Sequence, residues 1–89
     1  MPKVAFTNNL KRHIEVPEMF VAGTTVFELM NQIFDKYPAL RSYILDDRNR
    51  LRQHVNIFIN GQFITDRETL SDPVTENSDI FVMQALSGG

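Results

Sequence analysis

The sequence predicts an α+β fold in which a mixed sheet of four to five strands is covered on one face by one main helix. Segments with alternating apolar and polar residues lie near both ends of the chain, and one strongly amphipathic segment lies between them. No repeat or linker interrupts the 89 residues. One helix can cover one face of such a sheet, and the two chain ends can then pair as neighbouring parallel strands.

The composition indicates a single small domain over residues 1–89. Hydrophobic residues make up 43% of the chain and include seven Phe, which is enough for one core. The absence of cysteine excludes disulfides, thiolate nucleophiles and Cys-based zinc sites. No apolar run approaches the ~20 residues that cross a bilayer, and the first residues lack the pattern of a secretory signal. The expected location is therefore cytoplasmic.

The charge pattern is uneven although the net charge is only -2. This small negative charge argues against a general attraction for nucleic acid. The last quarter holds Arg67 among acidic residues, and a basic cluster lies in the middle of the chain, at Arg41, Arg48, Arg50 and Arg52. Two solvated faces would explain this arrangement, and so would a charge dipole that steers a partner.

The N-terminal third predicts a hairpin followed by an irregular connector. Apolar and polar residues alternate over residues 3–7 and again over 13–16, and Asn8-Asn9 between them tolerates a tight turn. The connector spans residues 17–23.

The main helix is predicted over residues 26–36. Thr25 and Glu28 have the spacing of a capping box, and Pro38 prevents continuation. Residues 39–45 can add a short helical turn before the polar loop at 46–49. The apolar stripe that identifies the helix recurs at three- and four-residue intervals, at Val26, Leu29, Met30, Ile33 and Tyr37.

The second half predicts another hairpin and a final strand. Asn60-Gly61 lies between the alternating segments 55–59 and 62–65, and this dipeptide favours a two-residue turn with positive φ. Residues 69–78 are expected to form a loop in which Asn77 could take the left-handed conformation. The last strand is expected over 80–85.

Strand alternation also predicts which side chains face away from the helix. If Val55, Ile57 and Ile59 face it together with Ile80 and Val82, then the opposite face carries Phe58, Phe81 and Met83. These three residues are candidates for a partner-binding patch. A few exposed apolar residues are also ordinary on any protein surface.

Several segments together resemble the MoaD/ThiS family of ubiquitin-like sulfur carriers over nearly the whole chain. They are the "VNIFING" stretch at 55–61, the "SDIFVM" strand at 78–83, and the terminal Ser87-Gly88-Gly89. The resemblance implies a ubiquitin-like β-grasp fold. Within the family, the segment 51–61 is similar to the subgroup whose members hand sulfur to a cysteine synthase.

The chain departs from the family pattern at two places. Asn77-Ser78 stand where members commonly have Gly-Asp, and Gln84 stands where a proline often stiffens the approach to the tail. Neither position touches the terminal carboxylate.

The resemblance implies a chemical role for Gly89. Its carboxylate would be adenylated by a ubiquitin-activating-like adenylyltransferase that uses ATP, and then converted to a thiocarboxylate. A downstream sulfur-accepting synthase of molybdopterin, thiamin or cysteine biosynthesis would receive the sulfur. The chain would bind no cofactor, catalyse nothing itself and be a monomer when free.

Glycine suits such a tail for physical reasons. Without a Cβ, Gly88 and Gly89 can thread a narrow channel and leave the acyl carbon open to attack. Ordering a flexible tail over residues 84–89 costs about 6–12 kcal/mol. A docking face on the folded part is therefore expected, and the candidate patch of Phe58, Phe81 and Met83 could supply it.

Other functions are weaker alternatives. His13 and His54 are expected to face water, and they lack the spacing of a metal site. A ubiquitin-like modifier would join Gly89 to lysines of other proteins. A non-covalent module could bind RNA through residues 11–13 and the arginines at 48, 50 and 52, although the net acidity argues against it.

Overall fold

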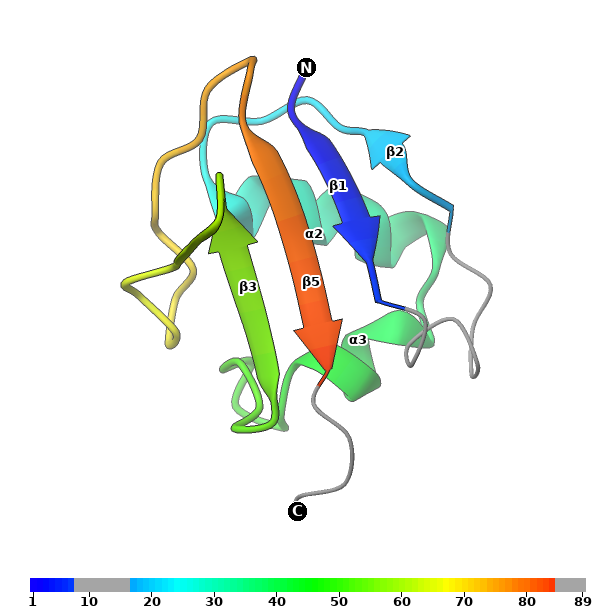
Figure 1. The fold of residues 1–89 in the computed structure, drawn as a ribbon. Coiled ribbons are helices and arrows are strands. Elements are labelled where there is room, and N and C mark those ends of the chain that lie inside the picture. The colour runs from blue at the N-terminus through cyan, green and yellow to red at the C-terminus, as the bar shows by residue number, and fades with distance from the viewer. Residues whose placement is uncertain (8–16, 85–89) are drawn as a thin grey trace.

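The computed structural model describes residues 1–7 and 17–84, which form a mixed five-stranded sheet with two helices (Figure 1). The sheet order is β2-β1-β5-β3-β4. This arrangement confirms the predicted α+β architecture with one main helix. None of the described helices is long and apolar enough to span a membrane. The elements are β1 (Lys3–Phe6), β2 (Met19–Phe20), α2 (Val26–Lys36), α3 (Leu40–Ile44), β3 (Val55–Ile59), β4 (Gln62–Phe63) and β5 (Asp79–Gln84).

Strand β5 is the middle strand of the sheet. It runs parallel to β1, with Val4 opposite Ile80, and antiparallel to β3, with Ile57 opposite Val82. The predicted parallel pairing of the chain's first and last strands is therefore confirmed. These four side chains point toward the helices and are almost completely buried. Figure 1 shows both helices on the same side of the sheet.

The N-terminal edge of the sheet differs from the prediction. The short strand β2 pairs antiparallel with β1, so the segment 17–23 is not wholly irregular as expected. Its pairing uses Lys3 and Val4 of β1. The turn at Asn8-Asn9 and the strand expected over 13–16 lie outside the described residues.

Helix α2 has the predicted bounds. Its N-terminus is capped by the residue that precedes it and by one loop that is distant in sequence. The Thr25 hydroxyl accepts from the Glu28 N–H at 3.2 Å. The carbonyls of Asp72 and Leu70 accept from the Val26 and Phe27 N–H groups, so the loop after β4 completes the cap. The Glu28 carboxylate reaches back over the start of the helix and accepts from the backbone N–H and the hydroxyl of Thr24 at 2.6 and 2.9 Å.

The stripe of α2 packs as predicted, with one addition. Val26, Leu29, Met30 and Ile33 are buried, and Tyr37 packs partly buried against them. Phe34 is also buried. Helix α3 then forms within the segment where a short helical turn was expected, and it buries Leu40 and Ile44.

The β3-β4 hairpin turns at Asn60 and Gly61, which have φ values of 51° and 84°. Both are positive, as the sequence predicts. Strand β4 ends at Phe63, two residues earlier than expected, and the next side chain, Ile64, turns into the core. The left-handed conformation expected at Asn77 is not found. In the loop after β4, Leu70 has a positive φ of 56° instead.

Candidate functional site

The predicted tail residues Ser87, Gly88 and Gly89 lie outside the described residues. The structure shows instead the strand from which they follow, since β5 ends at Gln84 between its neighbours β1 and β3. Gly89 is five residues beyond Gln84. Extended backbone spans at most about 18 Å over that length. Any enzyme that binds Gly89 must therefore lie close to this end of the sheet.

The sheet face opposite the helices carries three aromatic side chains in a transverse row, which we call the aromatic row: Phe63, Phe58 and Phe81. Phe58 lies opposite Phe81 of β5 on one side and opposite Phe63 of β4 on the other. The rings of Phe58 and Phe63 have centroids 4.6 Å apart and are tilted by 35°. Phe63 is 66% exposed and Phe81 is 40% exposed, while Phe58 between them is half-buried.

The structure thus brings two of the predicted patch residues, Phe58 and Phe81, into register. Met83, the third, is half-buried and lies opposite Asn56, two pairs nearer the tail and on the same face. Phe63 is a member that the sequence interpretation missed. Its place directly opposite Phe58 follows from the two-residue turn: counting outward from Asn60-Gly61 on both strands pairs Phe58 with Phe63.

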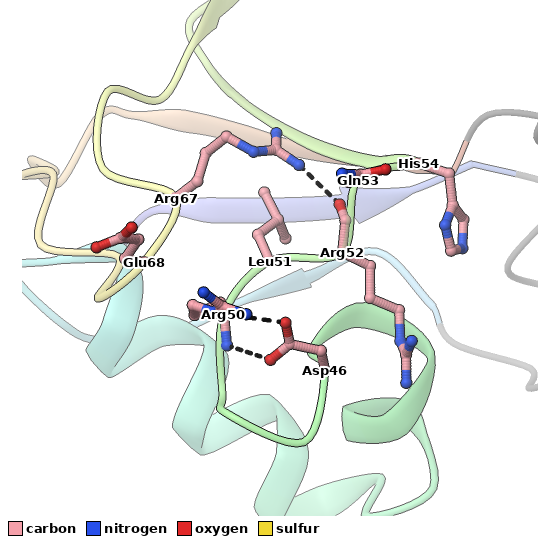
Figure 2. Close-up of a pocket in the computed structure, with 8 residues that line it drawn as sticks. All are labelled: Asp46, Arg50, Leu51, Arg52, Gln53, His54, Arg67 and Glu68. Carbon is pink, nitrogen blue, oxygen red and sulfur yellow. Dashed lines mark hydrogen bonds and ion pairs between the residues drawn. The ribbon is translucent and has the colours of Figure 1, made fainter.

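A second surface feature lies at the same end of the sheet as Gln84. It is an open cavity of about 520 Å³, shown in Figure 2. We call it the basic pocket, because three arginines line it together with His54. Its lining residues are Asp46, Arg50, Leu51, Arg52, Gln53, His54, Arg67 and Glu68.

Arg67 builds one wall of the basic pocket. Its Nη2 donates to the carbonyls of Arg52 and Val55 at 2.7 and 2.9 Å, and its Nη1 donates to Asn56 Oδ1 at 3.0 Å. Strand β4 is too short to pair with Val55, so the guanidinium occupies the edge of β3 that a longer strand would cover. Through Asn56, this side chain also links the pocket to the sheet face that carries Met83.

The opposite wall is a tight turn held by Asp46. Its carboxylate accepts from the backbone N–H groups of Arg48 and Arg50 at 2.8 and 3.0 Å, and it pairs with the Arg50 side chain at 3.4 Å. The Arg50 backbone N–H is the main cause that lowers the pKa of Asp46 below its ordinary value. Asn49 takes positive φ in this turn. Arg52 follows, and its Nε donates to the Ser42 carbonyl at 2.9 Å.

The loop that carries Arg67 is fixed by hydrogen bonds to two half-buried aspartates, Asp66 and Asp72. Asp72 accepts from the N–H groups of Thr65 and Asp66 at 2.8 and 2.7 Å. Asp66 accepts from the hydroxyls of Ser71 and Thr69 and from nearby backbone N–H groups. The Ser71 hydroxyl, followed by that of Thr69, holds the pKa of Asp66 well below its usual range.

The described part of the chain contains no group of three or more His, Asp or Glu side chains placed to hold a metal ion. His54, which was expected to face water, is half-buried at the rim of the basic pocket. His13 lies outside the described residues. Of the arginines considered for RNA, Arg50 and Arg52 line the pocket and Arg48 does not.

Comparison with known proteins identifies the fold and the family. The ThiS family model matches residues 6–89. No curated protein sequence matches the chain significantly. The solution structure of small archaeal modifier protein 1 from Methanosarcina acetivorans is 30% identical, with a TM-score of 0.81, and the match covers 99% of this chain and 95% of that one.

Two further structures share the fold at lower identity. The BexX/CysO complex from Amycolatopsis orientalis includes a chain that matches with a TM-score of 0.83 and 17% identity, over 100% of both chains. CysO from Mycobacterium tuberculosis matches with a TM-score of 0.81 and 16% identity, over 97% of this chain and all of that one. With the family model spanning nearly the whole sequence, the chain belongs to the ThiS family and has the ubiquitin-like β-grasp fold of sulfur carriers.

Proposed function

We propose that this protein is a sulfur carrier whose reactive group is the carboxylate of Gly89. The observation that carries the proposal is the Ser87-Gly88-Gly89 sequence inside the region that matches the ThiS family model. The partner would be an ATP-dependent activating enzyme related to the ubiquitin-activating class. The sulfur would pass to a synthase of molybdopterin, thiamin or cysteine biosynthesis.

The chemistry needs activation because a terminal carboxylate, with a pKa near 3.5, is ionised at neutral pH and is a poor electrophile. Attack of its oxygen on the α-phosphorus of ATP releases pyrophosphate and forms an acyl adenylate. A sulfur nucleophile at the oxidation level of sulfide then attacks the acyl carbon, and AMP leaves. The product is a thiocarboxylate on Gly89.

The folded part supports this role by anchoring and docking the tail. Because β5 is the central strand and pairs with a neighbour on both sides, the tail follows from the interior of the sheet. Ordering the five residues after Gln84 would cost about 5–10 kcal/mol. Because these side chains are already partly buried, covering what remains exposed of the aromatic row would contribute about 2–4 kcal/mol. A partner that covers this row could therefore offset part of the cost of ordering the tail.

Intact-mass measurement tests the proposal. After incubation with its activating enzyme, ATP and a sulfide donor, the chain should gain the mass that corresponds to replacing one oxygen with sulfur. The shift should be absent without ATP and in a variant that lacks Gly89. A wild-type chain that gains no sulfur under these conditions contradicts the proposal.

A second candidate is conjugation to other proteins, and the modifier protein of 30% identity favours it. The chain has no Lys or Arg after Arg67, so tryptic remnants of the native tail would be long. The variant Ser87→Arg would leave a Gly-Gly remnant on target lysines. If this variant is still adenylated but no remnant is found in cells, conjugation is excluded and the carrier function is unaffected.

A further inference from the structure

We propose that the basic pocket binds a single carboxylate side chain of the protein that handles the tail. This inference rests on the proposed function for the identity of the partner, but the pocket can also be tested without it. The unused donors of the pocket, its charge and its position all favour such a ligand.

Two arginines that line the basic pocket keep hydrogen-bond donors that the fold does not use. Arg67 donates three of its N–H groups to acceptors of β3 and the neighbouring loop. Its other guanidinium N–H groups make no hydrogen bond among the described residues. Arg52 donates only its Nε–H, to the Ser42 carbonyl, so its guanidinium lies at the side of the pocket toward α3 (Figure 2), and its Nη groups make no hydrogen bond among the described residues. Among the described residues, neither guanidinium forms an ion pair, although both are half-buried. Partly buried guanidiniums with free donors fit an oxyanion with a planar fork.

The charge of the lining favours a carboxylate over a phosphate. Three arginines face two carboxylates, so the lining has a net charge of +1 with His54 counted as neutral. Asp46 is already paired with Arg50, and Glu68 remains in the wall. A phosphate group carries about -1.5 to -2 at neutral pH and would meet repulsion from both acids. A carboxylate carries one charge and matches the net charge of the pocket.

The position of the basic pocket relates it to the tail. Val55, which follows the lining residues 52–54, lies directly opposite Gln84, the last residue of β5. Figure 1 shows the beginning of β3 and the end of β5 at the same end of the sheet. Asn56 joins the pocket to the outward sheet face, because its side chain accepts from Arg67 while Met83 lies opposite it. A protein that holds Gly89 at this end of the sheet therefore lies within reach of this pocket.

Adenylation kinetics with the activating enzyme of the same organism test the proposal. Arg52→Glu should raise KM about tenfold with little change in kcat, because one charge-assisted pair is replaced by a repulsive one. Glu68→Gln should lower KM, since it removes a negative charge from the wall. Arg48→Glu is the matched control: it makes the same charge change on an exposed residue of the same loop outside the pocket, and its KM should change less than about twofold.

The outcomes separate the pocket from the proposed function. If wild-type protein is adenylated and the Arg52 and Arg48 variants change KM equally, general charge steering explains the data and the pocket proposal is overturned. If Arg52→Glu does not fold, an unchanged KM in Glu68→Gln overturns it as well. If wild-type protein is not adenylated at all, the proposed function fails, and NMR titration decides about the pocket.

For that titration the probes are sodium acetate and inorganic phosphate. Acetate should shift the side-chain signals of Arg52, Arg67 and His54 in a saturable way and leave Arg48 unaffected. Stronger binding of phosphate than of acetate contradicts the preference for a carboxylate. Binding of a single-stranded RNA that both Arg48→Glu and Arg52→Glu abolish would assign this surface to nucleic acid and overturn the proposal.

Discussion

At the edge of the sheet, the guanidinium of Arg67 takes the place of missing strand residues. The carbonyl of Ile57 accepts from the N–H of Ile64, as in an ordinary ladder. Two residues earlier, the carbonyl of Val55 points to the same edge and accepts from Arg67. A single side chain therefore completes the edge of β3 and also joins it to the loop before it, through the carbonyl of Arg52.

Replacing Arg67 with Gln should lower the free energy of unfolding by about 1.5–3 kcal/mol, because hydrogen bonds from a charged donor to half-buried carbonyls are lost. Urea unfolding followed by circular dichroism measures this change. Arg48→Gln is the control, since Arg48 is exposed and should change stability by less than about 0.5 kcal/mol. Equal effects of the two substitutions would show that Arg67 contributes only its charge.

Asp66 makes the folding stability of the protein depend on pH. Hydrogen bonds from Ser71 and Thr69 lower its folded pKa below the ordinary value of 3.8. A depressed carboxylate pKa means that the unfolded chain binds the proton more tightly. The stabilisation is therefore present above about pH 4 and is lost as the pH falls through the folded pKa.

The urea midpoint of the wild-type protein should consequently fall between about pH 5 and pH 2. Asp66→Asn should start from a lower midpoint at neutral pH and fall less on acidification. Glu76→Gln, which removes an exposed carboxylate outside this network, should keep the wild-type slope. A slope unchanged by Asp66→Asn would show that other carboxylates, such as Asp46, carry the acid sensitivity.

At the scale of elements, the β3-β4 turn shows how local sequence can determine conformation. Gly61 has a φ of 84°, and nothing lies within 4 Å of the place where a Cβ would be. Gly61→Ala should therefore cost about 1–2 kcal/mol, entirely from the left-handed backbone and without a steric clash. Thermal unfolding measures it, with the exposed Gln62→Ala as control. A much larger loss would indicate that the turn also packs against other residues.

The elements predicted well are those whose signals are local. Helix α2 has its cap, stripe and stop within a few residues of each other, and the Asn60-Gly61 turn sets the hairpin register by itself. By contrast, β2 is two residues long and exists through its pairing with β1. The positive φ of Leu70 likewise belongs to a loop held by Asp66 and the start of α2, so no local pattern indicates it.

The candidate site likewise has one part that local sequence predicts and one part that it does not. Alternation placed Phe58 and Phe81 on the outward face, because the side-chain period of a strand is fixed. The basic pocket could not be found in this manner. Its walls come from residues 46–54 and 67–68, and they meet only because Arg67 reaches across to β3. The sequence groups Arg48 with Arg50 and Arg52, whereas in the fold Arg48 does not line the pocket.

At the scale of the whole molecule, exposed aromatic residues occur on both sides of the sheet, and this allows a matched test of docking. Phe63 and Phe81 lie on the outward face, while Phe27 is 51% exposed on helix α2, which covers the opposite face. Each substitution to Asp exchanges an exposed aromatic ring for a charge. Phe58 is less suitable, because it is half-buried against Phe63.

Phe81→Asp and Phe63→Asp should each lower kcat/KM for adenylation at least about tenfold, because a charge would be buried against an apolar partner surface. Phe27→Asp should leave kcat/KM near the wild-type value, since the partner that holds Gly89 covers the other face. Circular dichroism and the urea midpoint confirm that each variant is folded. If Phe27→Asp is as defective as Phe81→Asp while both remain folded, the activating enzyme does not dock on the aromatic row, and the tail alone directs recognition.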